Sequence, residues 1–364
     1  MQLVPIIAHM VPLQRWLPAL ELGPRPEFDQ SPKGLWIEPG DLLELINAWQ
    51  IAVWALAIAM VINPAIAFEP GTRGAPPVYP NEVVLLTTIV MRLWRKGYES
   101  FTGWLARNPK LALQLGYTQR DEGGHLRTIS SSQLSRRTRR LGLLPFFLFF
   151  VVMVVQLIRV GLIKGTDLII DCSKLQAWYH EDGDARWSYP SLWGKRTFGY
   201  KIHTVLCRYF TLPVMFWVTP ANRNECILAI PMLAACVLFY GFRVMVVRAD
   251  AAYFTYPILH FIVNVLGAYP IIDYNLRRLG KKFLATLDFI AEWRWLMGPR
   301  SDIERHYAWA KRYFGLKYFQ LAGLDNVLIY CCCTYIGMLA VALVACRCGR
   351  SELAGSRTQV LAWT

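Results

Sequence analysis

The chain has 364 residues, of which 55% are hydrophobic, and it carries 39 Lys or Arg against 25 Asp or Glu. That length allows one large or two modest domains and excludes a short peptide. The formal net charge of +14 predicts a polyanionic partner, because cationic side chains release counterions from phosphates, although an anionic membrane surface would attract the same charge.

The first residues lack a basic segment followed by a long apolar run and a small-residue cleavage site, so we expect no secretory signal and a cytoplasmic location. The nine cysteines follow neither a zinc-binding spacing nor a disulfide framework, which is typical of a reducing compartment. Residues 1–80 are rich in proline and predict an irregular N-terminal segment with one helix, from Asp41 to Ile62.

Residues 81–145 are expected to form a basic, helical DNA-binding region. The pattern predicts two amphipathic helices broken at Asn108-Pro109 and a third helix at 131–142. Residues 92–140 carry eleven Lys or Arg and three Asp or Glu, which concentrates the positive charge there. For any single arginine a solvated helix surface is the simpler interpretation, but as a group four arginines of the third helix favour phosphate binding: Arg136, Arg137, Arg139 and Arg140.

The pattern changes to strands after an apolar stretch at 145–163. Short apolar runs predict strands at 166–173, 198–210, 211–220, 243–250 and 268–275. A helix is predicted at 224–242, and the sequence is again helical from about Phe283. This order predicts an α/β fold with a mixed sheet flanked by helices over residues 146–350, followed by a tail at 351–364.

The apolar stretch from Val327 to Cys346 raises a membrane-spanning alternative. It has 20 residues without a charge, which is long enough to cross a bilayer. A fully buried core helix has the same hydropathy, and the Cys, Tyr and Thr residues of this stretch favour burial. We therefore expect no membrane partner and keep a basic integral membrane protein as the less favoured hypothesis.

Two of the predicted strands lead into a carboxylate, at Asp171 and at Asp250. Mg²⁺ and Mn²⁺ prefer oxygen ligands and leave positions open for a substrate phosphate, so a few Asp or Glu at a sheet edge suffice to hold two such ions. An acid after a strand is also a common turn or cap residue, and for either aspartate alone that interpretation is the simpler one.

A third acid, Glu304, is selected by helical geometry. Arg300, Glu304 and Lys311 stand at i, i+4 and i+11, so on a helix they fall within about 40° of one another. The same spacing suits a surface ion-pair ladder, whereas the functional interpretation is a metal ligand beside two phosphate contacts. Trp293 and Trp295 precede this segment and are candidates for stacking on an unpaired base, with a pair of core tryptophans as the favoured alternative.

With these segments identified, the chain resembles the bacterial insertion-sequence DDE transposases that carry a YREK signature: Tyr, two residues, Arg, three residues, Glu, six residues, Lys. Arg300, Glu304 and Lys311 fit that spacing, while Met297 occupies the tyrosine position. Further segments are similar to blocks of this family: SSSQLSRRTRRLG, DLIIDCSKLQAW, FGYKIHTVL, TPANRNE and RADAAYF. The similarity covers roughly residues 81–350.

The resemblance implies an RNase H-like fold and an endonuclease that cleaves at insertion-sequence ends and transfers strands with two Mg²⁺ or Mn²⁺ ions. It implies that Asp171, Asp250 and Glu304 are catalytic metal ligands, and that Arg300 and Lys311 contact DNA phosphates. Double-stranded DNA would be the partner of a homodimer that is cytoplasmic and associated with the nucleoid. A catalytically inactive DNA-binding protein derived from a transposase is the second hypothesis.

Overall fold

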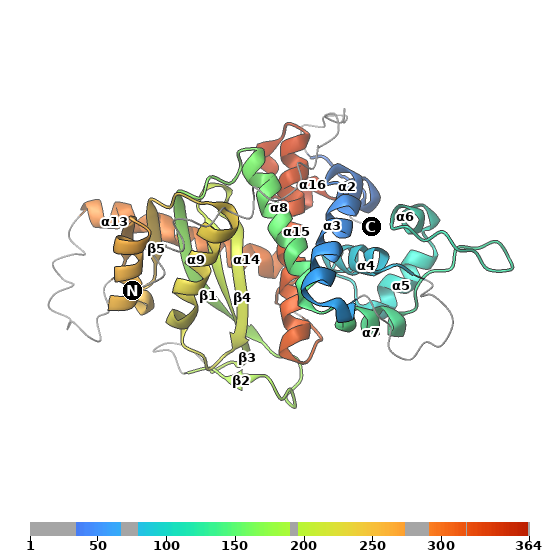
Figure 1. Cartoon of the computed structure of the whole chain (residues 1–364), viewed down its shortest axis with the longest axis horizontal. Helices are drawn as coiled ribbons and strands as arrows, with labels where there is room; N and C mark the ends of the chain where they lie inside the picture. The colour runs from blue at the N-terminus through green and yellow to red at the C-terminus, as the bar shows by residue number, and fades with distance from the viewer. Residues whose placement is uncertain (1–33, 67–78, 190–195, 274–290, 318, 363–364) are drawn as a thin grey trace. The chain divides into compact units, whose positions relative to one another are not determined.

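The computed structural model of the chain describes residues 34–66, 79–189, 196–273, 291–317 and 319–362 (Figure 1). Most of the Pro-rich N-terminal segment, and Phe283 with the start of the helical region predicted there, lie outside these residues. The chain divides into two compact units. We call them the sheet unit, which comprises the described residues of Val154–Arg312 and Leu316–Leu324, and the helical unit, which comprises those of Ala19–Met153, Tyr313–Gly315 and Asp325–Thr364.

The sheet unit contains one mixed sheet. Its strands in the described part of the chain are β1 (Asp167–Gln176), β2 (Arg186–Trp187), β3 (Phe198–Cys207), β4 (Leu212–Pro220), β5 (Val246–Ala249) and β6 (Tyr269–Ile272). The order is β2-β3-β1-β5-β6, with β4 also paired to β3. β3 is antiparallel to β1, β2 and β4, whereas β1, β5 and β6 are parallel to one another. The predicted α/β fold with a mixed sheet is confirmed, and β2 is an addition that the sequence did not predict.

The central strand β1 is covered on both sides. Leu168, Ile169 and Ile170 are all at most 2% exposed, and a continuous apolar run is what a strand buried on two faces requires. Figure 1 shows α9 and α14 on opposite faces of the sheet. The helical segments of this unit are η3 (Tyr209–Thr211), η4 (Glu225–Leu228), α9 (Ala229–Tyr240), η5 (Ala251–Tyr253), α10 (Tyr256–His260), η6 (Phe261–Val265), α13 (Ala291–Met297), η7 (Gly298–Ser301) and α14 (Asp302–Tyr313).

The helical unit is built from short helices and one long one. They are α2 (Pro39–Leu45), α3 (Ala48–Ile62), η2 (Pro64–Ile66), α4 (Asn81–Leu93), α5 (Tyr98–Ala106), α6 (Pro109–Gln114), α7 (Ser131–Leu141), α8 (Leu143–Arg159, which contains the boundary to the sheet unit), α15 (Leu324–Arg347), η8 (Ser351–Leu353) and α16 (Arg357–Val360). A helical N-terminal region was predicted, and it precedes the sheet as expected.

Two helix predictions were wrong in detail. The single helix predicted from Asp41 to Ile62 is two helices bent by 66°, because Asn47 takes a left-handed backbone conformation with φ 53°. The break at Asn108-Pro109 is confirmed, but a second break follows Trp94, where Arg95 has φ 57°. Left-handed residues end a helix; asparagine adopts this conformation more often than most residues, whereas arginine does so without a sequence signal.

The third basic helix, α7, begins where the sequence indicates. Ser130 Oγ accepts a hydrogen bond from Gln133 N at 3.3 Å, and Gln133 Oε1 accepts one from Ser130 N at 3.4 Å. This reciprocal capping box satisfies two N–H groups that the helix itself leaves without acceptors. The cap therefore fixes the start of the helix that carries the arginine cluster.

Helix α15 contains the longest apolar stretch, and every residue from Val327 to Ala345 is buried. Among the described residues it is the one helix long and apolar enough to cross a membrane, or one of up to three spans if two bent helix pairs are counted, by length and composition alone. Within the helical unit, the guanidinium of Arg92 lies 5.1 Å from the centre of the Tyr330 ring. These observations fit the interpretation of this stretch as a core helix.

Candidate active site

Asp171 and Asp250 lie at one edge of the parallel part of the sheet. The register of β1 and β5 pairs Ile170 with Ala249, so an aspartate follows on each strand at the same level. Each carboxylate accepts a hydrogen bond from the N–H of the next residue, at 2.7 Å for Asp171 and 2.6 Å for Asp250. The two side chains are thus oriented by their own backbones at neighbouring positions.

Strand β1 extends past Asp171 and past Ser173, where the predicted strand ends. It continues to Gln176, because β3 remains paired with it from Asp171↔Thr204 to Gln176↔Gly199. What ends at Asp171 is the pairing with β5. The Asp171 carboxylate therefore lies where the pairing of β1 with β5 stops and its pairing with β3 continues. From this point the edge of β1 that faced β5 is unpaired with any strand of the described residues.

The surroundings of Asp171 oppose its ionisation. Burial raises the pKa of this carboxyl to about 7, the N–H of Cys172 and the charge of Arg300 act in the opposite direction, and the carboxylates of Asp250 and Glu225 raise it again. Carboxylates from two other segments thus lie within electrostatic reach of Asp171. A divalent cation among them would offset both their repulsion and the cost of burial.

One face of α14 lies along β1. Tyr307 Oη donates to the backbone carbonyl oxygen of Asp171 at 2.9 Å, and Lys311 Nζ donates to Ser173 Oγ at 2.7 Å. Glu304 precedes Tyr307 by one helical turn and belongs to the same face. The helical spacing seen in the sequence therefore corresponds to a face that meets the strand of the first aspartate.

Glu304 itself is paired with Arg300. Arg300 Nη1 lies 3.2 Å from Glu304 Oε1, and the Glu304 side chain is 65% exposed. The charge of Arg300 also lowers the pKa of Asp171, so this guanidinium is within reach of both acids. The structure brings the Arg300–Glu304 pair to the vicinity of Asp171, where the charge of Arg300 acts on that carboxyl.

A further carboxylate, Glu225, was not assigned to the site by the sequence analysis. Strand β4 runs in the same direction as β1, because each is antiparallel to β3. Glu225 follows the end of β4 and so returns to the edge of the sheet that holds Asp171. The signal in the sequence was an acid shortly after a predicted strand, in the TPANRNE segment.

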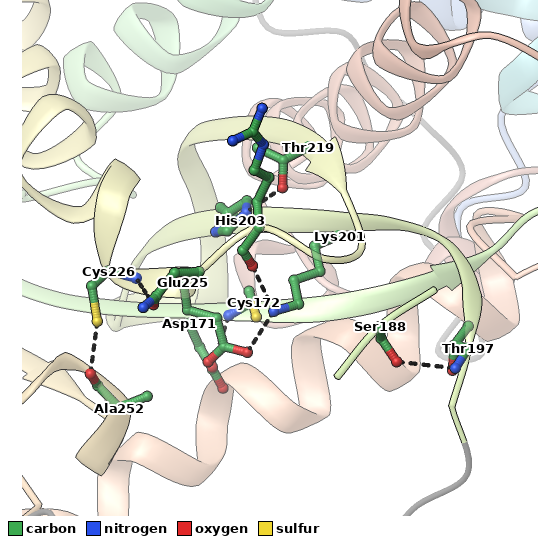
Figure 2. Close-up of polar contacts among 12 residues, drawn as sticks. Asp171, Cys172, Ser188, Thr197, Lys201, His203, Thr219, Glu225, Cys226 and Ala252 are labelled. Atoms are coloured by element: carbon green, nitrogen blue, oxygen red, sulfur yellow. Dashed lines mark hydrogen bonds and ion pairs between the residues drawn. The ribbon is translucent and has the colours of Figure 1, made fainter. Parts of the chain in front are cut away.

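A buried lysine neutralises Glu225 (Figure 2). Lys201 Nζ lies 3.1 Å from Glu225 Oε1 and donates to the carbonyl oxygen of Arg223 at 2.9 Å. Burial would raise the pKa of Glu225, but the charge and hydrogen bond of Lys201, together with a hydrogen bond from Cys172 and the charge of His203, hold the pKa below its usual value. Glu225 is therefore an ionised but paired neighbour of Asp171.

Asp167, at the start of β1, is neutralised on both sides. Arg248 Nε lies 3.0 Å from Asp167 Oδ1, and Arg208 Nη1 lies 3.2 Å from Asp167 Oδ2. The Asp167 and Arg248 side chains are 8% and 6% exposed. This acid belongs to a buried ion-pair network that joins β1 to β5 and stands apart from the candidate site.

The residues fit a divalent metal ion in part. No group of three or more His, Cys, Asp or Glu within the described residues is arranged to hold an ion. The adjacent aspartates and the raised pKa of Asp171 are what oxygen ligands of a cation would show in the absence of the ion. Glu304 differs, because its carboxylate would have to leave Arg300 to join the aspartates.

The two candidate stacking tryptophans lie on α13, before η7. Trp295 is 78% exposed and Trp293 is half-buried. Trp295 is therefore not a core residue, contrary to the favoured alternative of a pair of core tryptophans. An exposed indole of this kind is available to a ligand.

The four arginines of α7 fall into two classes. Arg136 and Arg139 are exposed, whereas Arg137 and Arg140 are half-buried. Arg137 donates to the carbonyl oxygen of Tyr79, and its Nη2 donates to Asn81 Oδ1 at 3.0 Å. The exposed pair is thus presented to solvent, while Arg137 is used within the helical unit.

The model of the protein family described as "Transposase DDE domain" matches residues 164–336, a little under half of the chain. The matched segment includes all six strands together with Asp171, Asp250 and Glu304. The match supports a DDE transposase domain, and the mixed sheet flanked by helices is consistent with the RNase H-like fold of such domains. Neither a curated protein nor a solved structure matches the chain significantly.

Proposed function

We propose that this chain is a bacterial insertion-sequence transposase that cleaves DNA at the ends of its element and transfers the strands with two Mg²⁺ or Mn²⁺ ions. The observation that carries the proposal is the pair of aspartates, Asp171 and Asp250, on neighbouring parallel strands inside the matched transposase segment. Glu304 is the proposed third ligand, and the YREK spacing of Arg300, Glu304 and Lys311 supports that choice.

Metal ions held by these carboxylates would activate water or a DNA 3′-hydroxyl for in-line attack on phosphorus and neutralise the developing charge. Backbone N–H groups orient Asp171 and Asp250. Arg300 is a cation beside Asp171. A phosphate oxygen of DNA would replace Glu304 as the partner of Arg300, and Glu304 would then be available to the metal. Lys311, next to Ser173, would bind a phosphate farther along the same DNA strand.

We further propose that residues 81–145 bind the double-stranded DNA of the element ends and that residues 146–350 carry out catalysis, as a homodimer in the cytoplasm associated with the nucleoid. The exposed Arg136 and Arg139 support this for α7, since an exposed guanidinium group is accessible to a phosphate. Arg137 and Arg140 contribute less in this proposal because both are half-buried.

The test is cleavage of a DNA fragment that carries the sequences flanking the gene, with Mg²⁺ or Mn²⁺. We expect Asp250→Asn to reduce cleavage by about a thousandfold, because a metal ligand supplies several kcal/mol to the transition state. Asparagine retains a side-chain oxygen for the N–H of Ala251, so the local fold is preserved. Glu304→Gln should have a similar effect.

The matched control is Asp302→Asn on the same helix. Asp302 pairs with Arg305 and lies about 200° around the helix from Glu304, so cleavage should stay near the native rate. Native cleavage by Asp250→Asn would contradict the metal assignment. A native protein that binds this DNA and never cleaves it would favour the inactive, transposase-derived DNA-binding protein, and Met297 together with the Arg300–Glu304 pair are the observations on that side.

Retention of the expressed protein in carbonate-washed membranes would favour the integral membrane alternative. The apolar helix α15 is the observation on which that alternative rests.

A further inference from the structure

A cavity of about 480 Å³ lies farther along β1 from Asp171. The last residues of β1 and the loop after it, Thr197 before β3, and α14 with the segment after it line this cavity. Lys174, Leu175 and Gln176 at the end of β1 line it, and Lys311, which donates to Ser173, connects it to the part of the strand nearer Asp171. Leu175 lies about 13 Å beyond Asp171 along the strand, the length of roughly four base pairs of duplex DNA.

The end of β1 is held in place by a close backbone approach. A Cβ atom at Gly199 would lie 2.1 Å from the carbonyl oxygen of Leu175, and Gly199 has φ 153°, so only glycine fits here. Ala177 N donates to Phe198 O at 2.9 Å. Thr197 N donates to Ser188 Oγ at 3.0 Å (Figure 2), which fixes another part of the wall. The cavity is thus framed by ordered backbone.

Exposed aromatic side chains follow the end of β1 in the chain. Trp178 lines the cavity and is 51% exposed. Tyr179, Trp187 and Tyr189 follow within the segment between β1 and β3 and are also exposed. Rings of this kind in a basic protein are stacking surfaces for nucleic acid bases, because every base has a π-face that an indole or phenol can cover.

The lining is also cationic. Lys174, Lys311 and Lys317 line the cavity, and no Asp or Glu is among the described residues that form it. Burial and the nearby charge of Lys317 lower the pKa of Lys311, so two ammonium groups lie close to each other. An anion between them would offset their repulsion, as a phosphate does.

We propose that this cavity binds a short single-stranded segment of DNA, with one base stacked on Trp178 and the adjoining phosphate bound by Lys311 and Lys317. A concave site selects an unpaired nucleotide, because a base inside a duplex has both faces and its pairing edge covered. The inference rests on the proposed function only for the source of the strand, which is the DNA adjoining the cut. The other occupant of an exposed aromatic surface, a second copy of this chain, is an outcome of the test.

The test is equilibrium binding of an oligothymidylate of about ten nucleotides, single-stranded or annealed to its complement, by fluorescence anisotropy in EDTA, so that cleavage plays no part. We expect Trp178→Ala to weaken single-strand binding about tenfold, equivalent to about 1.4 kcal/mol, because a stacked base loses its partner ring, and to change duplex binding by less than about twofold. Lys317→Ala should lower the slope of log affinity against log salt by about 0.7.

Two matched controls keep the native composition of the cavity. Trp217→Ala removes an exposed tryptophan of β4, and Lys164→Ala removes an exposed lysine before β1, and neither residue lines the cavity. Both should bind the single strand as the native protein does. Urea unfolding of every variant distinguishes lost contacts from lost folding.

Photo-crosslinking of the same oligonucleotide with 5-iodouracil, followed by peptide mapping, locates the bases. We expect the crosslink at Trp178. Crosslinks confined to Trp293 or Trp295, or native single-strand affinity in Trp178→Ala, would overturn the proposal. A Trp178→Ala protein with native affinity and an altered oligomeric state would assign the surface to a second copy and overturn it as well.

The two proposals fail separately. Metal-dependent cleavage that requires Asp250, without a Trp178 crosslink, removes the single-strand site and leaves the transposase. A Trp178 crosslink in a protein that never cleaves removes the catalytic assignment and leaves the single-strand site.

Discussion

Strand β1 carries two aspartates, four residues apart, in opposite electrostatic surroundings. Asp167 is paired with Arg248 and Arg208, so its charge is balanced inside the protein. Asp171 lies within reach of the carboxylates of Asp250 and Glu225, and burial with that repulsion raises its pKa to about 7. The first acid stabilises the fold, and the second is kept in an unfavourable state, which is typical of residues whose partner is a ligand.

The same contrast appears among the cations of α7. Arg137 donates to Tyr79 and Asn81 inside the helical unit, whereas Arg136 lies exposed one residue earlier. Each unit thus contains charged side chains that bond to other residues of the protein and, close by in the sequence, charged side chains that are available to a ligand. The difference suggests that structural and ligand-binding charges can be told apart by their partners rather than by their residue type.

The largest expected difference between the two aspartates is in catalysis. Asp171→Asn should reduce DNA cleavage by about a thousandfold, because it removes a proposed metal ligand. The folded fraction should not fall, since the substitution relieves carboxylate repulsion. The measurement is cleavage rate alongside circular dichroism. A cleavage rate within tenfold of native would break the comparison.

The reverse pattern is expected for Asp167→Asn. The substitution leaves the buried Arg248 without its counter-charge, which costs about 3–5 kcal/mol of folding free energy. Urea unfolding monitored by fluorescence measures this loss. Protein that remains folded should retain cleavage, and an unchanged unfolding midpoint would show that the ion pair contributes little.

The contribution of Asp171 to stability should depend on pH. An unfolded aspartate has a pKa of about 3.9, whereas that of folded Asp171 is about 7, so between these values only the folded state holds the proton. The contribution of Asp171 to stability therefore falls as pH rises from about 4 to about 7. Burial lowers the pKa values of His203 and His306 to about 4. These histidines act in the opposite direction, because their contribution to the stability of the protein is lost as pH falls.

The quantity to measure is therefore the difference in free energy of unfolding between the native protein and Asp171→Asn, determined in EDTA at pH 5 and at pH 8. We expect the native protein to lose stability relative to the variant at pH 8, and added Mg²⁺ to reduce that loss. Parallel stability curves for the two proteins would mean that Asp171 is an ordinary carboxylate.

The smallest effects are expected on α7. Arg137→Ala should destabilise the protein by about 1–3 kcal/mol, because it leaves the carbonyl oxygen of Tyr79 without its donor. Arg136→Ala should change stability by less than about 0.5 kcal/mol and lower the salt slope of duplex DNA binding by about 0.9. Urea unfolding and binding titrations at several salt concentrations measure the pair. Equal effects of the two variants on both quantities would erase the distinction.

Much of the sheet could be predicted because its strands are apolar runs of the right length. Leu168, Ile169 and Ile170 before Asp171 are buried on both sides of the sheet, and burial on two faces leaves a continuous hydrophobic run in the sequence. The end of β1 could not be predicted, because Cys172, Ser173 and Lys174 are half-buried and the strand is continued by its pairing with β3. Glu225 was missed because its position depends on the direction in which β4 crosses the sheet.

By itself, the sequence determined the mixed α/β class, the two acids that follow apolar strands, the start of α7 at its capping box, and a helical face that carries Glu304 and Lys311. These follow from short-range periodicity and local hydrogen bonding. Tertiary structure alone decided that β1 and β5 are parallel neighbours, that Asp167 is neutralised and Asp171 is not, that Glu304 pairs with Arg300, and that lysines and Trp178 line one cavity. The reason is that electrostatic environment depends on distances across the fold, and such distances have no local pattern in a chain.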